Sequence, residues 1–195
     1  MADAPSRPEL AAVLVKLRRR VDDHFDAAVA RTPADFACRD GCSTCCHQRI
    51  SVFAIEADAI RDALAELAVR DPELRARVRA QADAPAAQRH CALLVDDRCS
   101  IYPQRPLICR SHGLPVVADD RTPDKVDACP LNFRDTAPPP ASRLRLAAVN
   151  QPLAVLTELW SPRAPRVPLT ELARAADRAL EGPLHFPVDA LPSLK

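Results

Sequence analysis

Apolar positions recur every three or four residues in the first part of the chain, as expected for a helix with one buried face. The members of this stripe are Leu10, Val13, Leu14, Leu17, Val21 and Phe25. The pattern predicts a helix over residues 8–31, which ends at Thr32-Pro33. The basic run Lys16-Leu17-Arg18-Arg19-Arg20 lies within this helix and is expected to be a solvated face.

The next segments predict one short strand and two helices. Residues 48–53 alternate apolar and polar positions, which is typical of a strand. A second helical pattern begins near Ala54. Asp71-Pro72 has the form of an N-cap followed by proline at the first helical position, so a further helix is expected to run to about Ala84.

A β-hairpin is expected in the middle of the chain. Residues 91–95 and 98–102 flank Asp96-Asp97, a pair that suits a tight turn. With a two-residue turn, Cys91 would face the side of the hairpin opposite to Cys99. A three-residue loop would place both cysteines on one face, and the sequence leaves this register open.

Proline dominates the remaining pattern. Residues 103–133 are expected to be irregular, and Pro138-Pro139-Pro140 marks a boundary. Two helices are expected beyond it, over residues 144–160 and 170–180, the second ended by Gly182-Pro183.

Together these elements predict a mainly α fold with a small β-hairpin. An irregular cysteine-rich metal-binding segment is expected to pack against the helices. The predicted division of the chain is an N-terminal helix plus cysteine-cluster domain over residues 1–136 and a helical C-terminal extension over residues 137–195. No cysteine lies in that extension, so it is expected to offer packing or a surface for a protein partner.

Composition excludes several classes of function. Lys plus Arg (27) nearly balances Asp plus Glu (26), and aromatic residues make up 4% of the chain, so no nucleic-acid partner is expected. No apolar run approaches the length of about 18 residues that a membrane span requires. No secretory signal is visible at the N-terminus, which predicts a cytoplasmic protein with reduced thiols.

The candidate chemistry lies in eight cysteines, and clustered cysteines in a reducing compartment favour metal binding or catalysis. They are Cys38, Cys42, Cys45, Cys46, Cys91, Cys99, Cys109 and Cys129. Thiolates are soft ligands that suit zinc, copper(I) and iron-sulfur clusters. The spacing of Cys42 and Cys45 lets two sulfurs bind one ion from a turn. Cys46 directly follows Cys45, so both can reach one centre only if the backbone bends.

The eight sulfurs leave the number of centres open. They would satisfy two four-coordinate zinc ions, two four-iron clusters, or one centre with spare thiols. His112 follows Cys109 by three residues; it is either an extra ligand or a loop histidine bonded to the backbone. Arg105 and Arg110 either offset the charge of the thiolates or pair with surface carboxylates.

Three motifs in order resemble the YkgJ-like, or CxxCxxCC, cysteine-cluster proteins of bacteria and archaea. They are Cys38-x3-Cys42-x2-Cys45-Cys46, Cys91-Ala-Leu-Leu-Val-Asp-Asp-Arg-Cys99-Ser-Ile-Tyr102, and Arg105-Pro106-Leu-Ile-Cys109-Arg110. The resemblance covers residues 36–133. It departs from the family pattern at the first gap, which has three residues here instead of two.

The resemblance implies chelation of zinc or iron, including an iron-sulfur cluster, and the predicted ligand set comprises all eight cysteines. A related cysteine block occurs in flagellin lysine N-methylases. This chain has only three glycines and no glycine-rich loop for a nucleotide-like methyl donor, so methyl transfer is not expected. A structural or storage-like metal site is the leading hypothesis. An iron-sulfur redox enzyme and a metal-stapled protein-interaction module are the alternatives.

Overall fold

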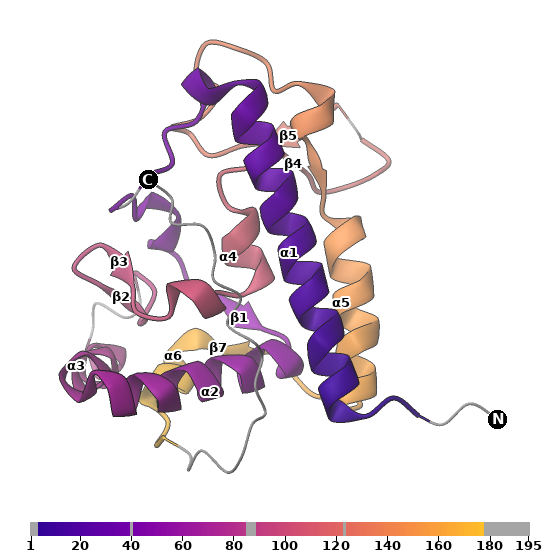
Figure 1. Ribbon diagram of the computed structural model, residues 1–195. Helices are drawn as coiled ribbons and strands as arrows, with labels where there is room; N and C mark the ends of the chain where they lie inside the picture. Colours follow the sequence, from indigo (N-terminus) through magenta and orange to yellow (C-terminus); the bar gives the residue numbers. More distant parts are fainter. Residues whose placement is uncertain (1–3, 40, 85–88, 123, 178–195) are drawn as a thin grey trace.

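The computed structural model describes residues 4–39, 41–84, 89–122 and 124–177. Its longest helix, α1 (Arg7–Arg31), starts with a capping box in which Glu9 Oε2 accepts the backbone N–H of Ser6 at 2.7 Å. This confirms the first predicted helix. Figure 1 shows α1 side by side with α5 (Ala147–Trp160), and the two share an apolar core.

Two further helices follow the predicted pattern. They are α2 (Ala54–Arg70) and α3 (Pro72–Asp83). The side chain of Asp71 accepts the backbone N–H of Leu74 at 2.9 Å, which confirms the predicted N-cap. A second apolar core joins α2 and α3 to α6 (Leu169–Arg174) and to a hairpin in the middle of the chain.

Among the described residues, the strands are all two residues long and form three small sheets. The hairpin pairs β2 (Leu94–Val95) with β3 (Arg98–Cys99), and β1 (Ser51–Val52) pairs with β7 (Val167–Pro168). The third sheet has the order β5-β4-β6, composed of β4 (Val116–Val117), β5 (Val126–Asp127) and β6 (Leu144–Arg145). The prediction of a mainly α fold with a small hairpin is thus confirmed.

The segment expected to be irregular contains ordered elements that the pattern missed. Besides β4 and β5, these are the 3₁₀ turn η4 (Tyr102–Gln104) and the short helix α4 (Leu107–Ser111). Another 3₁₀ turn, η5 (Pro140–Ser142), follows the proline run. The described part of the chain has no helix long and apolar enough to cross a membrane.

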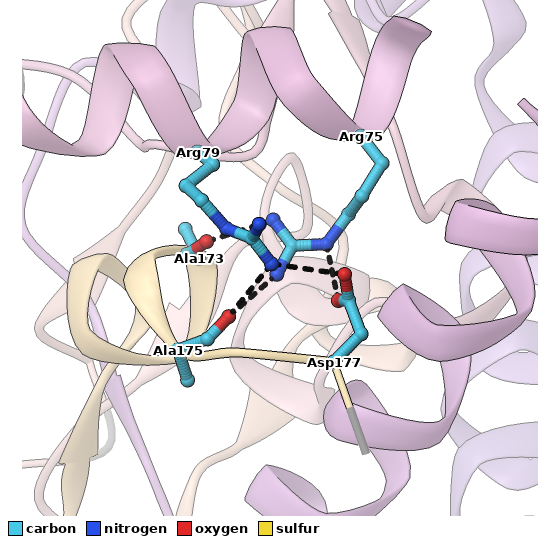
Figure 2. Close-up of polar contacts among 5 residues, drawn as sticks. All are labelled: Arg75, Arg79, Ala173, Ala175 and Asp177. Atoms are coloured by element: carbon cyan, nitrogen blue, oxygen red, sulfur yellow. Dashed lines mark hydrogen bonds and ion pairs between the residues drawn. The ribbon is translucent and has the colours of Figure 1, made fainter. Parts of the chain in front are cut away.

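The last described helix is fixed by two arginines of α3, as Figure 2 shows. Arg75 donates to Asp177 Oδ1 at 2.6 Å and to the carbonyl oxygens of Ala173 and Ala175, each at 2.8 Å. Arg79 donates to Asp177 Oδ2 at 2.9 Å. Because these carbonyls lie at the C-terminal end of α6, the guanidinium groups satisfy acceptors that the helix itself leaves unpaired.

Helix boundaries in the C-terminal third differ from the predicted ones. The helix expected over 144–160 begins at residue 147, because residues 144 and 145 pair with β4 as a strand. The helix expected over 170–180 ends at residue 174, and its predicted stop at Gly182-Pro183 lies outside the described residues. Both α5 and α6 pack in the cores described above. The division of the chain at residue 136 stays a prediction.

Three side chains lie differently from their expected places. Arg18 is 4% exposed instead of solvated, and its Nη1 donates to Gln104 Oε1 at 2.9 Å. Burial lowers the pKa of Arg18 to about 10. Val13 is 48% exposed although it belongs to the apolar stripe, and Tyr102, expected in the core, is 44% exposed. The buried face of α1 therefore includes Arg18 and leaves out Val13.

Candidate metal centre

The hairpin brings two cysteines to one side of the second core. Its turn has two residues, Asp96 and Asp97, with φ of 51° and 58°, and it places Leu94 opposite Cys99. Cys91 precedes the strand ladder, and Leu94 donates to its carbonyl at 3.1 Å in a turn of its own. This turn frees Cys91 from the strand alternation, so that Cys91 and Cys99 pack against the same core despite the short turn.

The N-terminal cysteines lie in a loop that two 3₁₀ turns shape. These are η1 (Pro33–Asp35) and η2 (Thr44–Cys46). In η2 the backbone N–H of Cys46 donates to the carbonyl oxygen of Ser43 at 2.8 Å. The backbone is therefore bent at Cys45 and Cys46, as it must be if both side chains are to reach one centre. The side chains of Cys45 and Cys46 are hydrogen-bonded to each other. The carbonyl of Cys46 accepts the N–H of Cys91 at 2.7 Å, which ties this loop to the hairpin segment.

Four thiols from three separate segments form what we call the inner group: Cys45, Cys91, Cys99 and Cys109. Burial raises the pKa of Cys109 well above its ordinary value, and the thiols of Cys99, Cys91 and Cys45 raise it further. Burial also raises the pKa of Cys91 to about 12, with added contributions from Cys99 and Cys45. The pKa of Cys45 is raised first by its hydrogen bond with Cys46 and then by burial. The effects of these thiols on one another's pKa indicate that they lie in one region of the molecule.

Helix α4 positions Cys109 in this group. Its N-terminus is capped from a distant segment, because Oε1 of Glu56 accepts the N–H of Leu107 at 2.8 Å. Glu56 is 2% exposed, and burial raises its pKa, although the bond from Leu107 and the charge of Arg18 oppose the shift. The carboxylate on α2 therefore determines where the cysteine-bearing turn begins.

Two arginines connect this turn to α1. Arg110 is 3% exposed and donates to Asp22 on α1, to the Pro103 carbonyl at 2.5 Å and to the Arg105 carbonyl at 2.9 Å. Arg110 thus pairs with a carboxylate, as one of the two predictions had it, but this carboxylate is partly buried and does not lie on the surface. Arg105 lies 3.8 Å from Asp22 and stacks 3.9 Å from the centroid of the Tyr102 ring.

The charge of Arg105 also acts on the inner group. It lowers the pKa of Cys45 and of Cys99, against the larger opposing effects that raise both. The Nε atom of Arg105 is buried without a hydrogen-bond acceptor among the described residues. A guanidinium in this position can stabilise negative charge on sulfur.

Three of the remaining thiols are grouped by their effects on the pKa of Cys38. We call Cys38, Cys42 and Cys129 the outer group. Cys38 is exposed and the other two are half-buried. Burial raises the pKa of Cys38, the Asn132 amide lowers it, and the thiols of Cys129, Cys42 and Cys45 raise it. Cys46 belongs to neither group. Among the described residues, the one thiol that it interacts with is that of Cys45.

His112 makes the backbone hydrogen bond expected of an ordinary loop histidine. Its Nδ1 lies 2.6 Å from the carbonyl oxygen of Ile108. Its Nε2 lies 2.7 Å from the amide Nε2 of Gln48, which also donates to the Cys45 carbonyl at 2.7 Å. With Nδ1 as donor, Nε2 accepts from Gln48. Burial lowers the pKa of His112, which favours this neutral form.

The donor set suits a soft metal. All eight cysteines are free thiols, and thiolates bind zinc or iron in preference to hard cations. Within the described ranges, however, no three His, Cys, Asp or Glu side chains are already spaced to hold an ion. The thiols would have to move closer together to bind an ion.

The comparison with known families bears directly on these thiols. Residues 37–130 match the family model CxxCxxCC, described as "Putative zinc- or iron-chelating domain". Over these residues the chain is similar to this chelating domain. This match confirms the resemblance drawn from the cysteine motifs, and its limits enclose all eight cysteines. No curated protein and no solved structure matches the chain.

Sequence reasoning missed several residues that surround the cysteines. Glu56, Asp22, Arg18 and Asn132 position the cysteine-bearing segments from distant places in the chain. A charged residue at an inward-facing position of a predicted helix is the sequence signal that could have identified two of them. Arg18 and Glu56 each stand beside buried apolar neighbours in α1 and α2.

Proposed function

We propose that this protein binds zinc or iron through its cysteine thiolates, with Cys45, Cys91, Cys99 and Cys109 as the four ligands of one centre. The observation that carries the proposal is the contact between the cysteine-bearing segments: the Cys46 carbonyl accepts the N–H of Cys91 at 2.7 Å, and Cys91 and Cys99 pack against one core. The raised pKa values of Cys91 and Cys109 agree with this arrangement. Four thiolates complete the tetrahedral shell of a structural zinc ion or the ligand set of a four-iron cluster.

The surroundings of these thiols support binding of a cation. Buried thiols that repel one another's ionisation stay protonated without a metal, and a divalent ion offsets the charge that they would otherwise hold unpaired. Arg105 supplies a further positive charge beside Cys45 and Cys99. Binding would also join the hairpin, α4 and the N-terminal loop, whose regular backbone ladders are short.

The experiment is anaerobic purification followed by elemental analysis, sulfide determination and an absorbance spectrum. A colourless protein with zinc supports a structural or storage site. A brown protein with iron and sulfide supports the iron-sulfur alternative with redox chemistry. A chain that holds neither metal after anaerobic loading with Zn²⁺ or Fe²⁺ would refute the proposal.

Variants identify the ligands. Cys99→Ser is expected to lose the metal and to lower the melting temperature in the same step. Ser100→Ala is the matched control, because its hydroxyl is buried without a partner among the described residues and should be dispensable. Equal metal content in Cys99→Ser and Ser100→Ala would remove Cys99 from the ligand set.

We further propose a cytoplasmic location, supported by eight thiols that are all unpaired. Recruitment of a protein partner by the C-terminal helices remains a weaker candidate. The exposed Val155 and Leu159 on α5 favour it, at 63% and 54% exposure. A pull-down with Val155→Ser/Leu159→Ser against the unmodified chain tests this candidate.

A further inference from the structure

The loop that carries Cys46 runs beside the segment that carries Cys91. The carbonyl oxygen of Cys46 accepts the backbone N–H of Cys91 at 2.7 Å. The next pair of residues is also in contact, because the rings of His47 and His90 meet edge to face with their centroids 6.4 Å apart. The two segments therefore run in opposite directions at this point, with Cys46 opposite Cys91.

This hydrogen bond limits how far apart the two cysteines can lie. Standard bond lengths on either side of an N···O distance of 2.7 Å allow at most about 6 Å between the Cα atoms of Cys46 and Cys91. Disulfides join cysteines whose Cα atoms are roughly 4.4–6.8 Å apart. The adjacent pair of Cys45 and Cys46 does not meet this requirement, since neighbouring Cα atoms across a trans peptide are about 3.80 Å apart.

A second contact holds the loop on the hairpin. The hydroxyl of Ser43 donates to Oδ1 of Asp97 at 2.8 Å, and Asp97 lies in the hairpin turn. The carbonyl oxygen of Ser43 accepts the N–H of Cys46 at 2.8 Å, so the turn that bears Cys46 is tied to the hairpin at its start. The approach of Cys46 to Cys91 therefore does not depend on a single hydrogen bond.

The sulfurs of Cys46 and Cys91 lie beside a common neighbour. The thiol of Cys45 is hydrogen-bonded to that of Cys46 and also raises the pKa of Cys91. Both Cys46 and Cys91 are free and half-buried, so a small oxidant from solution can reach them. A disulfide requires the Cys46 side chain to turn about its Cα–Cβ bond, from Cys45 toward Cys91.

We propose that Cys46 and Cys91 form a reversible disulfide when the protein meets hydrogen peroxide. The Cys46 thiolate takes one oxygen atom from the peroxide, becomes a sulfenic acid, and releases hydroxide, which takes up the proton that the thiol lost. The Cys91 sulfur then attacks the sulfenic sulfur. The S–S bond forms, the S–O bond breaks, and the departing hydroxide leaves with the Cys91 proton as water. Overall, two thiols and one peroxide give one disulfide and two water molecules.

The disulfide would make the proposed metal centre sensitive to oxidation. This consequence rests on the proposed function, in which Cys91 is a ligand and Cys46 is not. A sulfur bound in a disulfide is no longer a thiolate, so oxidation removes one of the four ligands and is expected to release the metal. Reduction by a dithiol reverses the step and restores the ligand.

The test is peptide mapping of the reduced, metal-free chain after treatment with peroxide and alkylation of the remaining thiols. Trypsin leaves Cys91 as the one cysteine of the peptide 90–98, whereas Cys46 lies in the peptide 40–49. A cross-link between these two peptides, located at Cys46 by fragmentation, is expected. Cys46→Ser should lose the cross-link, and the matched control Cys42→Ser, in the same peptide, should keep it.

A second measurement follows the release of zinc from the loaded chain with a metal indicator. Peroxide is expected to release zinc at least about 10 times more slowly from Cys46→Ser than from the unmodified chain, because the variant lacks the thiol that captures Cys91. Equal rates of release would refute the link to the metal.

The outcomes separate this proposal from the proposed function. An unmodified chain without the cross-link, or with disulfides confined to other cysteines, would overturn the proposal whether or not Cys46→Ser folds. A chain that binds no zinc would refute the proposed function instead, and the mapping of the metal-free chain would still decide on the disulfide.

Discussion

Removal of the Asp22 carboxylate is expected to destabilise the protein strongly through a residue 88 positions away in the sequence. Asp22 pairs with Arg110, whose side chain is 3% exposed. Burial lowers the pKa of Arg110 and raises the pKa of Asp22, in each case against the attraction of the partner. Arg110 is buried and Asp22 is partly buried, so loss of the carboxylate leaves the guanidinium charge without its ion-pair partner.

The expected loss of unfolding free energy depends on the hydrogen bonds that Arg110 keeps in the variant. Breaking a buried ion pair by deleting one member costs about 3–5 kcal/mol. In Asp22→Ala the guanidinium keeps its bonds to the carbonyls of Pro103 and Arg105, and alanine favours the helix by up to about 0.7 kcal/mol. We therefore expect a loss at the lower end, about 3 kcal/mol of the free energy of unfolding.

The assay is urea denaturation followed by far-ultraviolet circular dichroism, with reductant and chelator present so that metal binding does not contribute. Asp23→Ala is the matched control, since Asp23 is the next residue of α1 and is exposed. It should change stability by less than about 0.5 kcal/mol. The double variant Asp22→Leu/Arg110→Met should recover much of the loss, because apolar side chains of similar size replace the pair. A cost below about 1 kcal/mol for Asp22→Ala would refute the reasoning.

Three further predictions concern the metal centre and the C-terminal helix. Arg105→Gln is expected to weaken zinc binding at the inner group by about 10-fold, because it removes the positive charge beside Cys45 and Cys99. Competition with a chelator measures the zinc affinity, and an unchanged affinity would contradict the prediction. Because the pKa of Cys91 is about 12, against an ordinary 9.0, its thiol is protonated at neutral pH. Zinc must displace that proton, so proton release should accompany binding and affinity should rise with pH, as a pH indicator in weak buffer would record. Arg75→Ala is expected to cost about 2 kcal/mol in urea denaturation, because Arg75 is buried and bonded to a carboxylate and two carbonyls. A cost no larger than that of exposed Arg77→Ala would be the contrary result.

The long helices could be predicted because their information is local. Helix α1 was found within one residue of its start, and the Asp71-Pro72 signal located the start of α3. Strands of two residues carry no such period, so β4, β5 and β6 were missed. Helix α4 was missed for another reason: its cap, Glu56, lies 51 residues upstream of the N–H that it accepts.

The thiol groups show the same limit of local patterns. The sequence identified the eight cysteines and the turn at Asp96-Asp97, which has the two-residue form. It did not indicate which sulfurs lie together, because that depends on a turn before the ladder at Cys91 and on the buried amide of Asn132. Strand alternation alone would have separated Cys91 from Cys99.

The carboxylates of Glu56 and Asp22 join the segments that carry the inner group, which explains why charged residues lie at such enclosed positions. Segments with short backbone ladders cannot fix four thiols by hydrogen-bonded strands, and half-buried cysteines contribute little packing. Directional bonds to Glu56 and Asp22 supply this positioning at a desolvation cost that apolar residues would avoid. If the proposed centre holds zinc as a structural ion, its binding would contribute on the order of 10 kcal/mol to folding. The polar contacts would then determine where the cysteine-bearing segments lie, and the metal would add the stability that those contacts do not supply.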